Sequence, residues 1–375
     1  ATLLHVSNLF YIPQQTQLAK LLCDHSFADR VFFSNSGAEA NESAIKLARK
    51  WAKEHGASDR GDIITMRGGF HGRTLATVTA TAQEKYHHGF EPLPGGFKYV
   101  PFNDLRAVER AIDSRTAAVM VEPIQGEGGV NIPDDGYLPG LRKLCDEAGV
   151  LLVLDEIQTG MGRTGRLWGY EHSGIEPDIM TLAKALANGV PIGATLATES
   201  VASAFTPGTH GSTFGGNPFA TGVGLTVFTT LMEERLPERA AVTGRRLRDQ
   251  LEALRGRHPK AITAVRGRGL LVGMDLVPPV GDVIGACRER GLLVLSAGDN
   301  ALRLAPPLIV DEASVGRAVE IIDQALAAGA KGATSSRSAI SPGKTSRASS
   351  PSPPSSRPAR RPVTGGPRCP DAAWP

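Results

Sequence analysis

The sequence predicts an α/β protein with a mostly parallel central sheet, helices on both faces of that sheet, and a smaller α+β domain at its carboxyl end. Residues 150–154 (VLLVL) form a short unbroken apolar run, which is the pattern of a strand buried on both faces of a parallel sheet. Residues 178–183 (DIMTLA) form a second such segment. Beyond Arg257, short strand-like and helical segments alternate, which indicates the smaller domain.

Both apolar segments end on residues that can carry out chemistry. The first stops at Asp155 and Glu156, and the second stops at Lys184. Ligands of open α/β sheets bind at the carboxyl ends of the strands. A desolvated lysine can form a Schiff base, and a carboxylate can keep a pyridinium nitrogen protonated. The pair therefore suggests pyridoxal phosphate chemistry, although each residue alone is more simply read as a surface lysine or an acidic turn.

Length and composition restrict the class of protein. The 375 residues allow two or three domains with a sizeable core. No apolar run approaches the roughly 20 residues of a membrane helix and no secretory signal pattern opens the chain, so cytoplasm is the default expectation. The cysteines show neither CxxC nor any other metal-ligand spacing, and no metal is predicted; they are Cys23, Cys145, Cys287 and Cys369.

The positive charge is concentrated at the carboxyl end. Of the net +3, residues 331–375 contribute +7 through eight Lys or Arg and one Asp, which leaves −4 for the rest. The basic balance therefore does not argue for nucleic-acid binding by the fold. Ser, Pro and Arg dominate this tail without periodicity, which predicts disorder. An out-of-frame or read-through terminus is the preferred explanation, ahead of a basic interaction tail.

Near the amino end, a helix is expected over residues 16–24 and a strand over residues 31–33. The small polar turn that follows, SNSGAEANE at residues 34–42, opens a long amphipathic helix through Trp51. Exposed amides at such a helix start make a phosphate cup, and Gly37 permits close backbone approach. From spacing alone, an ordinary helix cap is the simpler interpretation.

Two further strands are expected to end in polar loops. The strand at residues 62–66 runs into RGGFHGRT, where Phe70 could stack on a ring and Arg73 could bind a carboxylate, although arginines in glycine-rich loops are usually solvated. After a helix over residues 104–113, the strand at 117–121 ends in EPIQGEGG. Its two glutamates, Glu122 and Glu127, are also compatible with a divalent-metal site or a glycosidase acid and base, but no cluster of His or Asp accompanies them.

The remaining elements are expected in alternation. Arg303 stands alone in an apolar strand, so it should have a carboxylate partner. The expected strands and helices are a strand at 190–198, a helix from Glu199, a turn at 210–218, a helical stretch from Phe219 to Arg257, strands within 262–277, 291–296 and 301–305, and helices at 282–290 and 312–328.

Five strings in these segments resemble the class III pyridoxal-phosphate-dependent aminotransferases: LDEIQTG, TLAK, NSGAEANE, FHGRT and VEPIQGEGG. The resemblance covers about residues 4–328 and implies the type I fold of pyridoxal-phosphate-dependent transferases. It also implies a division of the chain into a remnant of an amino-terminal segment (1–25), a large cofactor-binding domain (26–217), a small α+β domain (218–330) and the tail (331–375).

The resemblance assigns a role to each site residue. Lys184 would be the Schiff-base lysine and Asp155 the partner of the ring nitrogen. The other cofactor contacts implied are Ser36, Gly37, Ala38, Phe70, Glu156, Ile157, Gln158 and Thr213, the last of these reaching the cofactor of a partner subunit in an obligate homodimer. The implied substrate contacts are Arg73, Glu127, Ser212 and Arg303, with Glu127 masking Arg303 until the α-carboxylate of glutamate binds.

SNLFY at residues 7–11 and FHGRT are similar to segments of the acetylornithine aminotransferases in that family. This implies transamination of N2-acetyl-L-ornithine with 2-oxoglutarate in arginine biosynthesis. Succinylornithine, ornithine and other ω-amino acids are the alternative substrates. SNLFY lies well inside those relatives, so a preceding segment of several dozen residues is expected, and a truncated, catalytically inactive protein is the alternative function.

Overall fold

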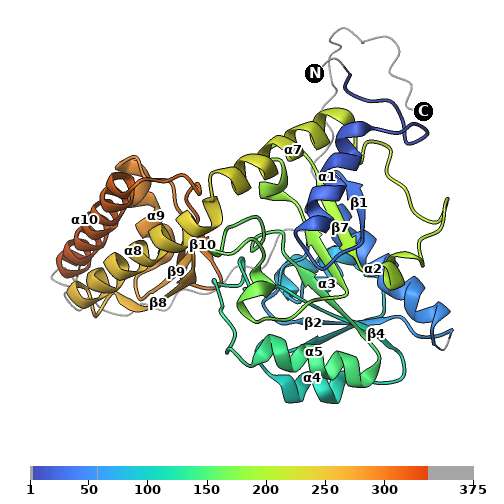
Figure 1. Ribbon diagram of the computed structural model, residues 1–375. Coiled ribbons are helices and arrows are strands. Elements are labelled where there is room, and N and C mark those ends of the chain that lie inside the picture. The colour runs from blue at the N-terminus through green and yellow to red at the C-terminus, as the bar shows by residue number, and fades with distance from the viewer. Residues whose placement is uncertain (1–2, 57, 337–375) are drawn as a thin grey trace, which may run out of the picture. The chain divides into compact units, whose positions relative to one another are not determined.

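The computed structural model describes residues 3–56 and 58–336, which are built around two β-sheets (Figure 1). In this part of the chain, no helix has the length and apolar character needed to cross a membrane. The last helix continues past Lys331 to Ser336, so the predicted start of the tail falls within a helix. The rest of that predicted segment lies outside the described residues.

The larger sheet is mostly parallel, as predicted. Only β7 is antiparallel to its neighbours β6 and β1. The four other neighbouring pairs are parallel. The strands lie in the order β1 (Arg30–Ser34), β7 (Gly193–Ala197), β6 (Ile179–Leu182), β5 (Leu151–Asp155), β4 (Thr116–Val121), β2 (Asp62–Met66) and β3 (Phe97–Val100).

Helices cover both faces of this sheet. Alternate residues of β5 enter two different cores, Leu152 and Leu154 one of them and Leu151 and Val153 the other. This explains the unbroken apolar run, because every residue of the strand is buried. The first core also receives side chains from α1 (Pro13–Asp24), α4 (Leu105–Ala111), α5 (Tyr137–Ala148) and α7 (Pro218–Glu233). The second receives them from α2 (Gly37–Glu54), α3 (Leu75–Ala80) and α6 (Glu199–Ala202).

The smaller sheet is entirely antiparallel and has a core of its own, which confirms the predicted α+β unit at the carboxyl end. Figure 1 shows helices packed around its strands. The strand order is β10 (Leu295–Ala297), β11 (Ala301–Leu304), β9 (Leu271–Leu276) and β8 (Ile262–Arg268). The helices are α8 (Leu236–Arg257), α9 (Val280–Glu289) and α10 (Glu312–Ser336).

The helical stretch expected from Phe219 to Arg257 is two helices, α7 and α8. Arg235 adopts a left-handed conformation with φ of 51° between them. Pro237 then occupies the first turn of α8. A proline is tolerated there because the first N–H groups of a helix have no partner within the helix, whereas inside a continued α7 it would remove a backbone hydrogen bond. The chain therefore changes direction here, and α8 belongs to the small sheet.

Candidate active site

A cavity of about 410 Å³ opens at the carboxyl end of the larger sheet and gathers most of the predicted site residues. Its position agrees with the crevice expected for an open α/β sheet. The predicted residues in its wall are Ser36, Gly37, Ala38, Phe70, Arg73, Asp155, Ile157, Gln158 and Lys184. The wall also contains His71 and Glu122, to which the family resemblance assigned no role.

Lys184 follows β6 directly and begins a single 3-10 turn, Lys184–Leu186. Its φ is 39°, a conformation that non-glycine residues rarely adopt and that is typical of strained functional positions. Its side chain is accessible from the cavity, yet the surrounding walls desolvate the amine and lower its pKa. The carboxylates of Asp155, Glu122 and Glu127 oppose this shift without reversing it. At a given pH, the fraction of free amine is therefore higher than for an exposed lysine.

Asp155 is buried at the end of β5 and is held by two side-chain donors. Its Oδ2 lies 2.8 Å from Asn41 Nδ2 and 2.8 Å from His71 Nδ1. Its Oδ1 accepts the backbone N–H of Ile157 at 3.1 Å. Burial works to lower the pKa of His71, but the hydrogen bond and charge of Asp155 outweigh it, so the net direction is upward. The carboxylate is therefore fixed in one orientation toward the cavity.

Asn41 and His71 are the functional positions that the sequence interpretation did not assign. Asn41 is buried, donates also to the carbonyl of His71 at 2.7 Å, and accepts from Thr181 Oγ1 at 2.7 Å. It thus ties α2, the loop before α3, β5 and β6 together. The only available signal was that both residues stand inside quoted strings, Asn41 in NSGAEANE and His71 in FHGRT.

The start of α2 forms one corner of the cavity. Ser36 caps the helix, and its side chain accepts the N–H of Glu39 at 3.2 Å. A Cβ atom added to Gly37 would lie 2.8 Å from Ile157 Cδ1, so glycine lets the helix start pack against this residue. The free amides and the positive end of the helix dipole favour a negatively charged group at this corner.

Glu122 supports the loop that carries Phe70. Its carboxylate accepts the N–H of Phe70 at 2.9 Å and that of Gly126 at 3.1 Å. Burial raises the pKa of Glu122 to about 7; the charge of Asp155 adds to this shift, while the charge of His71 and the two N–H groups oppose it. It therefore holds the loop, and with it the ring of Phe70, against the cavity wall.

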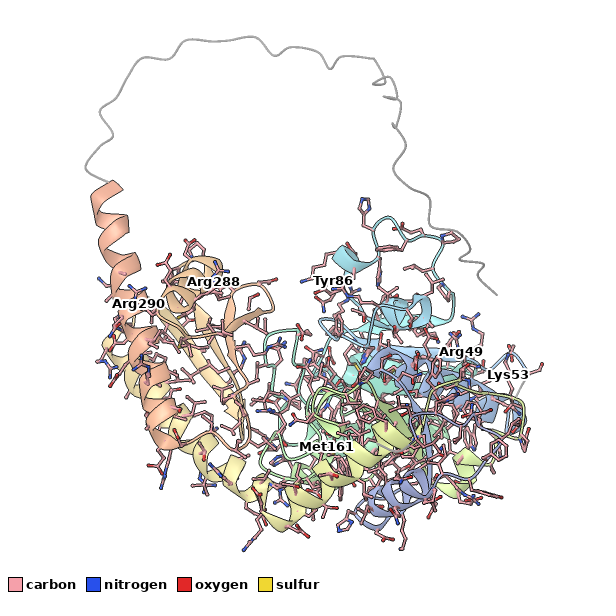
Figure 2. All side chains as sticks on the ribbon, turned by 90° about the horizontal axis from the view of Figure 1, so that it is seen from above. Arg49, Lys53, Tyr86, Met161, Arg288 and Arg290 are labelled. Atoms are coloured by element: carbon pink, nitrogen blue, oxygen red, sulfur yellow. The ribbon has the colours of Figure 1, made fainter. Side chains whose placement is uncertain are left out.

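Arg73 lies at the exposed rim beside two aromatic rings. Its guanidinium carbon is 4.2 Å from the centroid of Tyr86 and 5.6 Å from that of Phe70. Tyr86, labelled in Figure 2, belongs to the short 3-10 helix Glu84–Tyr86 and was not predicted as a site residue. Such stacking holds an arginine in place without neutralising its charge, so the guanidinium stays available for a carboxylate.

Arg303 has the carboxylate partner that its position in an apolar strand required. Its Nη1 lies 2.7 Å from Glu127 Oε1. Gln158 bridges the two, donating to Glu127 at 3.3 Å and accepting from Arg303 at 3.3 Å. The arginine side chain is 10% exposed and the glutamate 30%. The pair thus stands at the edge of the site, where the glutamate can exchange its partner for water.

The structure does not place Glu156 in the cavity wall, in contrast to the predicted cofactor contact. Its carboxylate accepts from Thr159 Oγ1 at 2.6 Å and from the N–H groups of Gly169 and Tyr170, each at 2.8 Å. Consecutive residues at a strand end point to opposite sides, so Asp155 and Glu156 cannot share one surface. We therefore assign Glu156 to the support of the following loop.

The exposed Thr213 also lies outside this cavity, and its predicted contact with a partner's cofactor stays a prediction. Ser212 is held beside the cavity, because its hydroxyl accepts from Asn35 Nδ2 at 3.0 Å and from the N–H of Gly215 at 3.1 Å. The turn is therefore packed against the residue that precedes the phosphate-type corner.

The buried carboxyl of Glu156 predicts a pH dependence of stability. Burial raises the pKa of Glu156 to about 7. Between the ordinary glutamate value and about 7, only the folded chain retains this proton. The free energy of unfolding should therefore fall with rising pH, by up to about 1.4 kcal/mol per pH unit for this group.

Glu156→Gln removes this contribution while retaining the size of the side chain. Urea unfolding at pH 5, 6 and 7 measures the difference between wild type and variant. We expect the advantage of the wild type to shrink as pH rises through this window. A difference that is independent of pH would contradict the assignment.

The fold and the site geometry agree with comparisons to known proteins. The family model for aminotransferase class-III matches residues 1–326, and the chain belongs to this family of aminotransferases. It is 50% identical to the acetylornithine aminotransferase of Nostoc sp. (strain PCC 7120), covering 86% of this chain and 78% of that protein. It is 52% identical to the acetylornithine aminotransferase of Thermosynechococcus vestitus, covering 87% and 81%.

Solved structures of the same family superimpose on the chain. The ornithine aminotransferase of Toxoplasma gondii ME49 has a TM-score of 0.85 at 36% identity and covers 88% of this chain and 80% of its own. The acetylornithine aminotransferase of Elizabethkingia anophelis has a TM-score of 0.75 at 35% identity, covering 86% and 81%. These findings confirm the resemblance and the type I fold inferred from the sequence.

Proposed function

We propose that this aminotransferase transfers the δ-amino group of N2-acetyl-L-ornithine to 2-oxoglutarate, giving N-acetyl-L-glutamate 5-semialdehyde and L-glutamate in arginine biosynthesis. One observation carries the proposal. A chain about 50% identical to acetylornithine aminotransferases holds a desolvated lysine, a fixed carboxylate and Arg73 in the wall of one cavity, and a second arginine, Arg303, contacts Gln158 of the same wall. Pyridoxal phosphate is the proposed cofactor.

The residues present fit this cofactor. The helix start at Ser36, Gly37 and Ala38 suits its phosphate, and the carboxylate of Asp155 suits its protonated ring nitrogen. Phe70 suits the ring face, while Lys184 Nζ would hold the carbonyl carbon. When bound, pyridoxal phosphate supplies an electron sink for the carbon that carries the amino group.

Three residues then have defined tasks in the transfer. Lys184 Nζ, whose pKa is lowered by desolvation, would be released from the cofactor by the δ-amine of acetylornithine and would then move the proton from the δ-carbon to the cofactor's carbonyl carbon, as general base and then acid. Asp155 keeps the proton on the ring nitrogen, and its two donors prevent the carboxylate from turning away. His71 thereby acts as a positioning residue behind Asp155.

Two arginines would distinguish the two substrates. Arg73 binds the α-carboxylate of acetylornithine from its stacked position beside Tyr86. Arg303 binds the α-carboxylate of glutamate or 2-oxoglutarate. Glu127 pairs with Arg303 when acetylornithine occupies the cavity and leaves it when the second substrate arrives. One cavity can in this way accept a neutral acetamido group and a carboxylate in turn.

The proposal includes a homodimer with composite sites. Large apolar side chains are exposed near the amino end, including Leu9 at 85%, Phe10 at 67% and Tyr11 at 102%. The neighbouring turn is joined to this segment by an edge contact between the rings of His5 and Phe214, at 5.0 Å between ring centroids. Exposed large apolar side chains on the segment that contacts the turn of Thr213 are typical of a subunit interface. A cytoplasmic location also stays a prediction.

Steady-state kinetics with three amino donors tests the substrate. We expect kcat/KM with 2-oxoglutarate to be highest for N2-acetylornithine, lower for N2-succinylornithine and lowest for ornithine, whose charged α-amine would lie beside Arg73. A preference for ornithine would overturn the substrate assignment. Bound cofactor without reaction on any of the three would favour the inactive alternative.

A further inference from the structure

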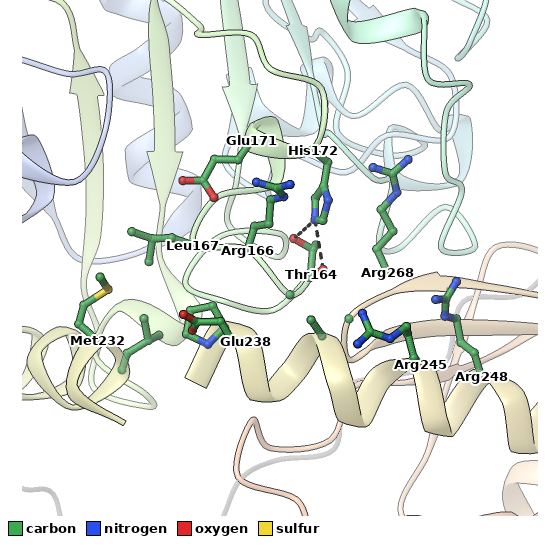
Figure 3. A pocket seen from close by; sticks show the side chains of 15 residues that line it. Thr164, Arg166, Leu167, Glu171, His172, Met232, Glu238, Arg245, Arg248 and Arg268 are labelled. Carbon is green, nitrogen blue, oxygen red and sulfur yellow. Dashed lines mark hydrogen bonds between the residues drawn. The ribbon is translucent and has the colours of Figure 1, made fainter. Parts of the chain in front are cut away.

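A second cavity, of about 720 Å³, lies outside the active site and shares no lining residue with it. It is enclosed by the loop at residues 164–172, the end of α7, the first half of α8 and the turn between β8 and β9 (Figure 3). Cavities of this size are typical of small-molecule sites. The proposed transamination uses none of its residues.

The wall of this cavity is strongly basic. Four arginines line it, against two glutamates, Glu171 and Glu238. The arginines are Arg166, Arg245, Arg248 and Arg268. Glu238 pairs with Arg235, which does not line the cavity, at 3.3 Å, and Arg268 reaches Asp135, which is 97% exposed, at 3.0 Å. The positive charge inside the cavity is therefore only partly compensated by the protein.

Two further residues of this wall, Arg248 and His172, respond to these surroundings. Arg248 Nε is buried and lacks a hydrogen-bond partner among the described residues. Leaving a buried donor unpaired is costly, so a negatively charged group beside this guanidinium would stabilise it. Burial, followed by the charges of Arg268 and Arg166, lowers the pKa of His172 to about 4. The histidine is therefore neutral at physiological pH and adds no charge of its own.

The base of the cavity is rigid, because three chain segments meet there through glycines. A Cβ atom on Gly244 of α8 would collide with the carbonyl of Gly269, and one on Gly269 would collide with the backbone at Thr164. A Cβ atom on Gly165 would lie 2.9 Å from Ala241. This junction fixes the backbone from which the arginines extend, which reduces the entropy lost when a ligand binds.

The two ends of the cavity differ in character. Figure 3 shows Leu167 and Met232 at one end and Arg245, Arg248 and Arg268 at the other. Leu231 and Pro237 also line it and add apolar surface. A complementary ligand thus has an apolar body at one end and a negatively charged group at the other.

We propose that this cavity binds a small amphiphilic anion, with its phosphate or carboxylate group on Arg245, Arg248 and Arg268 and its apolar or aromatic body against Leu167 and Met232. Such a ligand would connect the loop at 164–172 with α8. That loop is attached through Gly169 and Tyr170 to Glu156, the neighbour of Asp155. The site is therefore a candidate position for an effector of the enzyme.

Isothermal titration calorimetry of the cofactor-loaded enzyme tests the proposal with phenyl phosphate, phenylacetate and inorganic phosphate as probes. We expect saturable binding of phenyl phosphate or phenylacetate, and the tighter of the two identifies the anionic group. Inorganic phosphate should bind more weakly because it lacks the apolar body. The double variant Arg245→Gln/Arg248→Gln should weaken binding by at least about tenfold, since two charged hydrogen-bond donors are removed.

Arg255→Gln is the matched control, because Arg255 lies on the same helix but pairs with Glu252 at 2.6 Å, outside the cavity. It should bind the probes like the wild type. Circular dichroism and unchanged turnover establish that the double variant is folded. The proposal is overturned if the wild type binds neither aromatic anion saturably, or if the double variant binds them as tightly as the control.

Discussion

Lys184→Ala should abolish transamination and leave the fold intact. The side chain stands in the cavity and contributes no apolar packing to either core of the larger sheet, so its removal has little effect on stability. General base catalysis alone is worth about 10²–10⁴ in rate, and the same residue would hold the cofactor. We therefore expect turnover to fall by at least about 10⁴-fold.

Turnover, circular dichroism and the visible absorbance of bound pyridoxal phosphate measure this outcome. Lys184→Arg is a useful companion variant, because it keeps the positive charge but cannot supply a free amine at neutral pH. It should be as inactive as the alanine variant. Normal turnover in either variant would exclude Lys184 as the catalytic base.

Arg303→Ala should separate the two half-reactions. The arginine would bind only the α-carboxylate of 2-oxoglutarate or glutamate, through charged hydrogen bonds worth about 1.5–3 kcal/mol each. The KM for 2-oxoglutarate should therefore rise by roughly 10–100-fold. The half-reaction with N2-acetylornithine should change little, because Arg73 binds that substrate.

Arg73→Ala is the matched opposite of this variant and should impair the half-reaction with acetylornithine. Single-turnover measurements with each substrate alone would distinguish the two effects. The proposed role of Arg303 is contradicted if Arg303→Ala slows both half-reactions equally. It is also contradicted if the variant slows the half-reaction with acetylornithine more than the one with 2-oxoglutarate.

The parts of the fold that could be predicted are those where burial produces a recognisable pattern of apolar residues in the sequence. The runs that became β5 and β6 are buried on both faces, so they read as unbroken apolar segments. Arg303 was expected to have a carboxylate partner because a lone charge in an apolar strand is costly, and Glu127 meets that requirement.

Other features of the fold produce no comparable pattern in the sequence. The edge strand β3 has mostly half-buried residues, and α5 contains Pro139 and Gly140, which weaken a helical pattern. Neither element was identified. The contacts that fix Asp155 join residues 114 and 84 positions apart, Asn41 and His71 respectively. Such pairings depend on the order of the strands, which local periodicity does not reveal.

The antiparallel strand β7 acts as a spacer between two parts of the site. It lies between β1, which leads to the phosphate-type corner, and β6, which leads to Lys184. β1 and β6 are therefore two strand spacings apart, about 10 Å in total. A Cβ atom on Gly193, the first residue of β7, would collide with the backbone at Ser36, so even this small addition would shift the corner. The sheet thus fixes the separation between the helix start at Ser36 and the turn that carries Lys184.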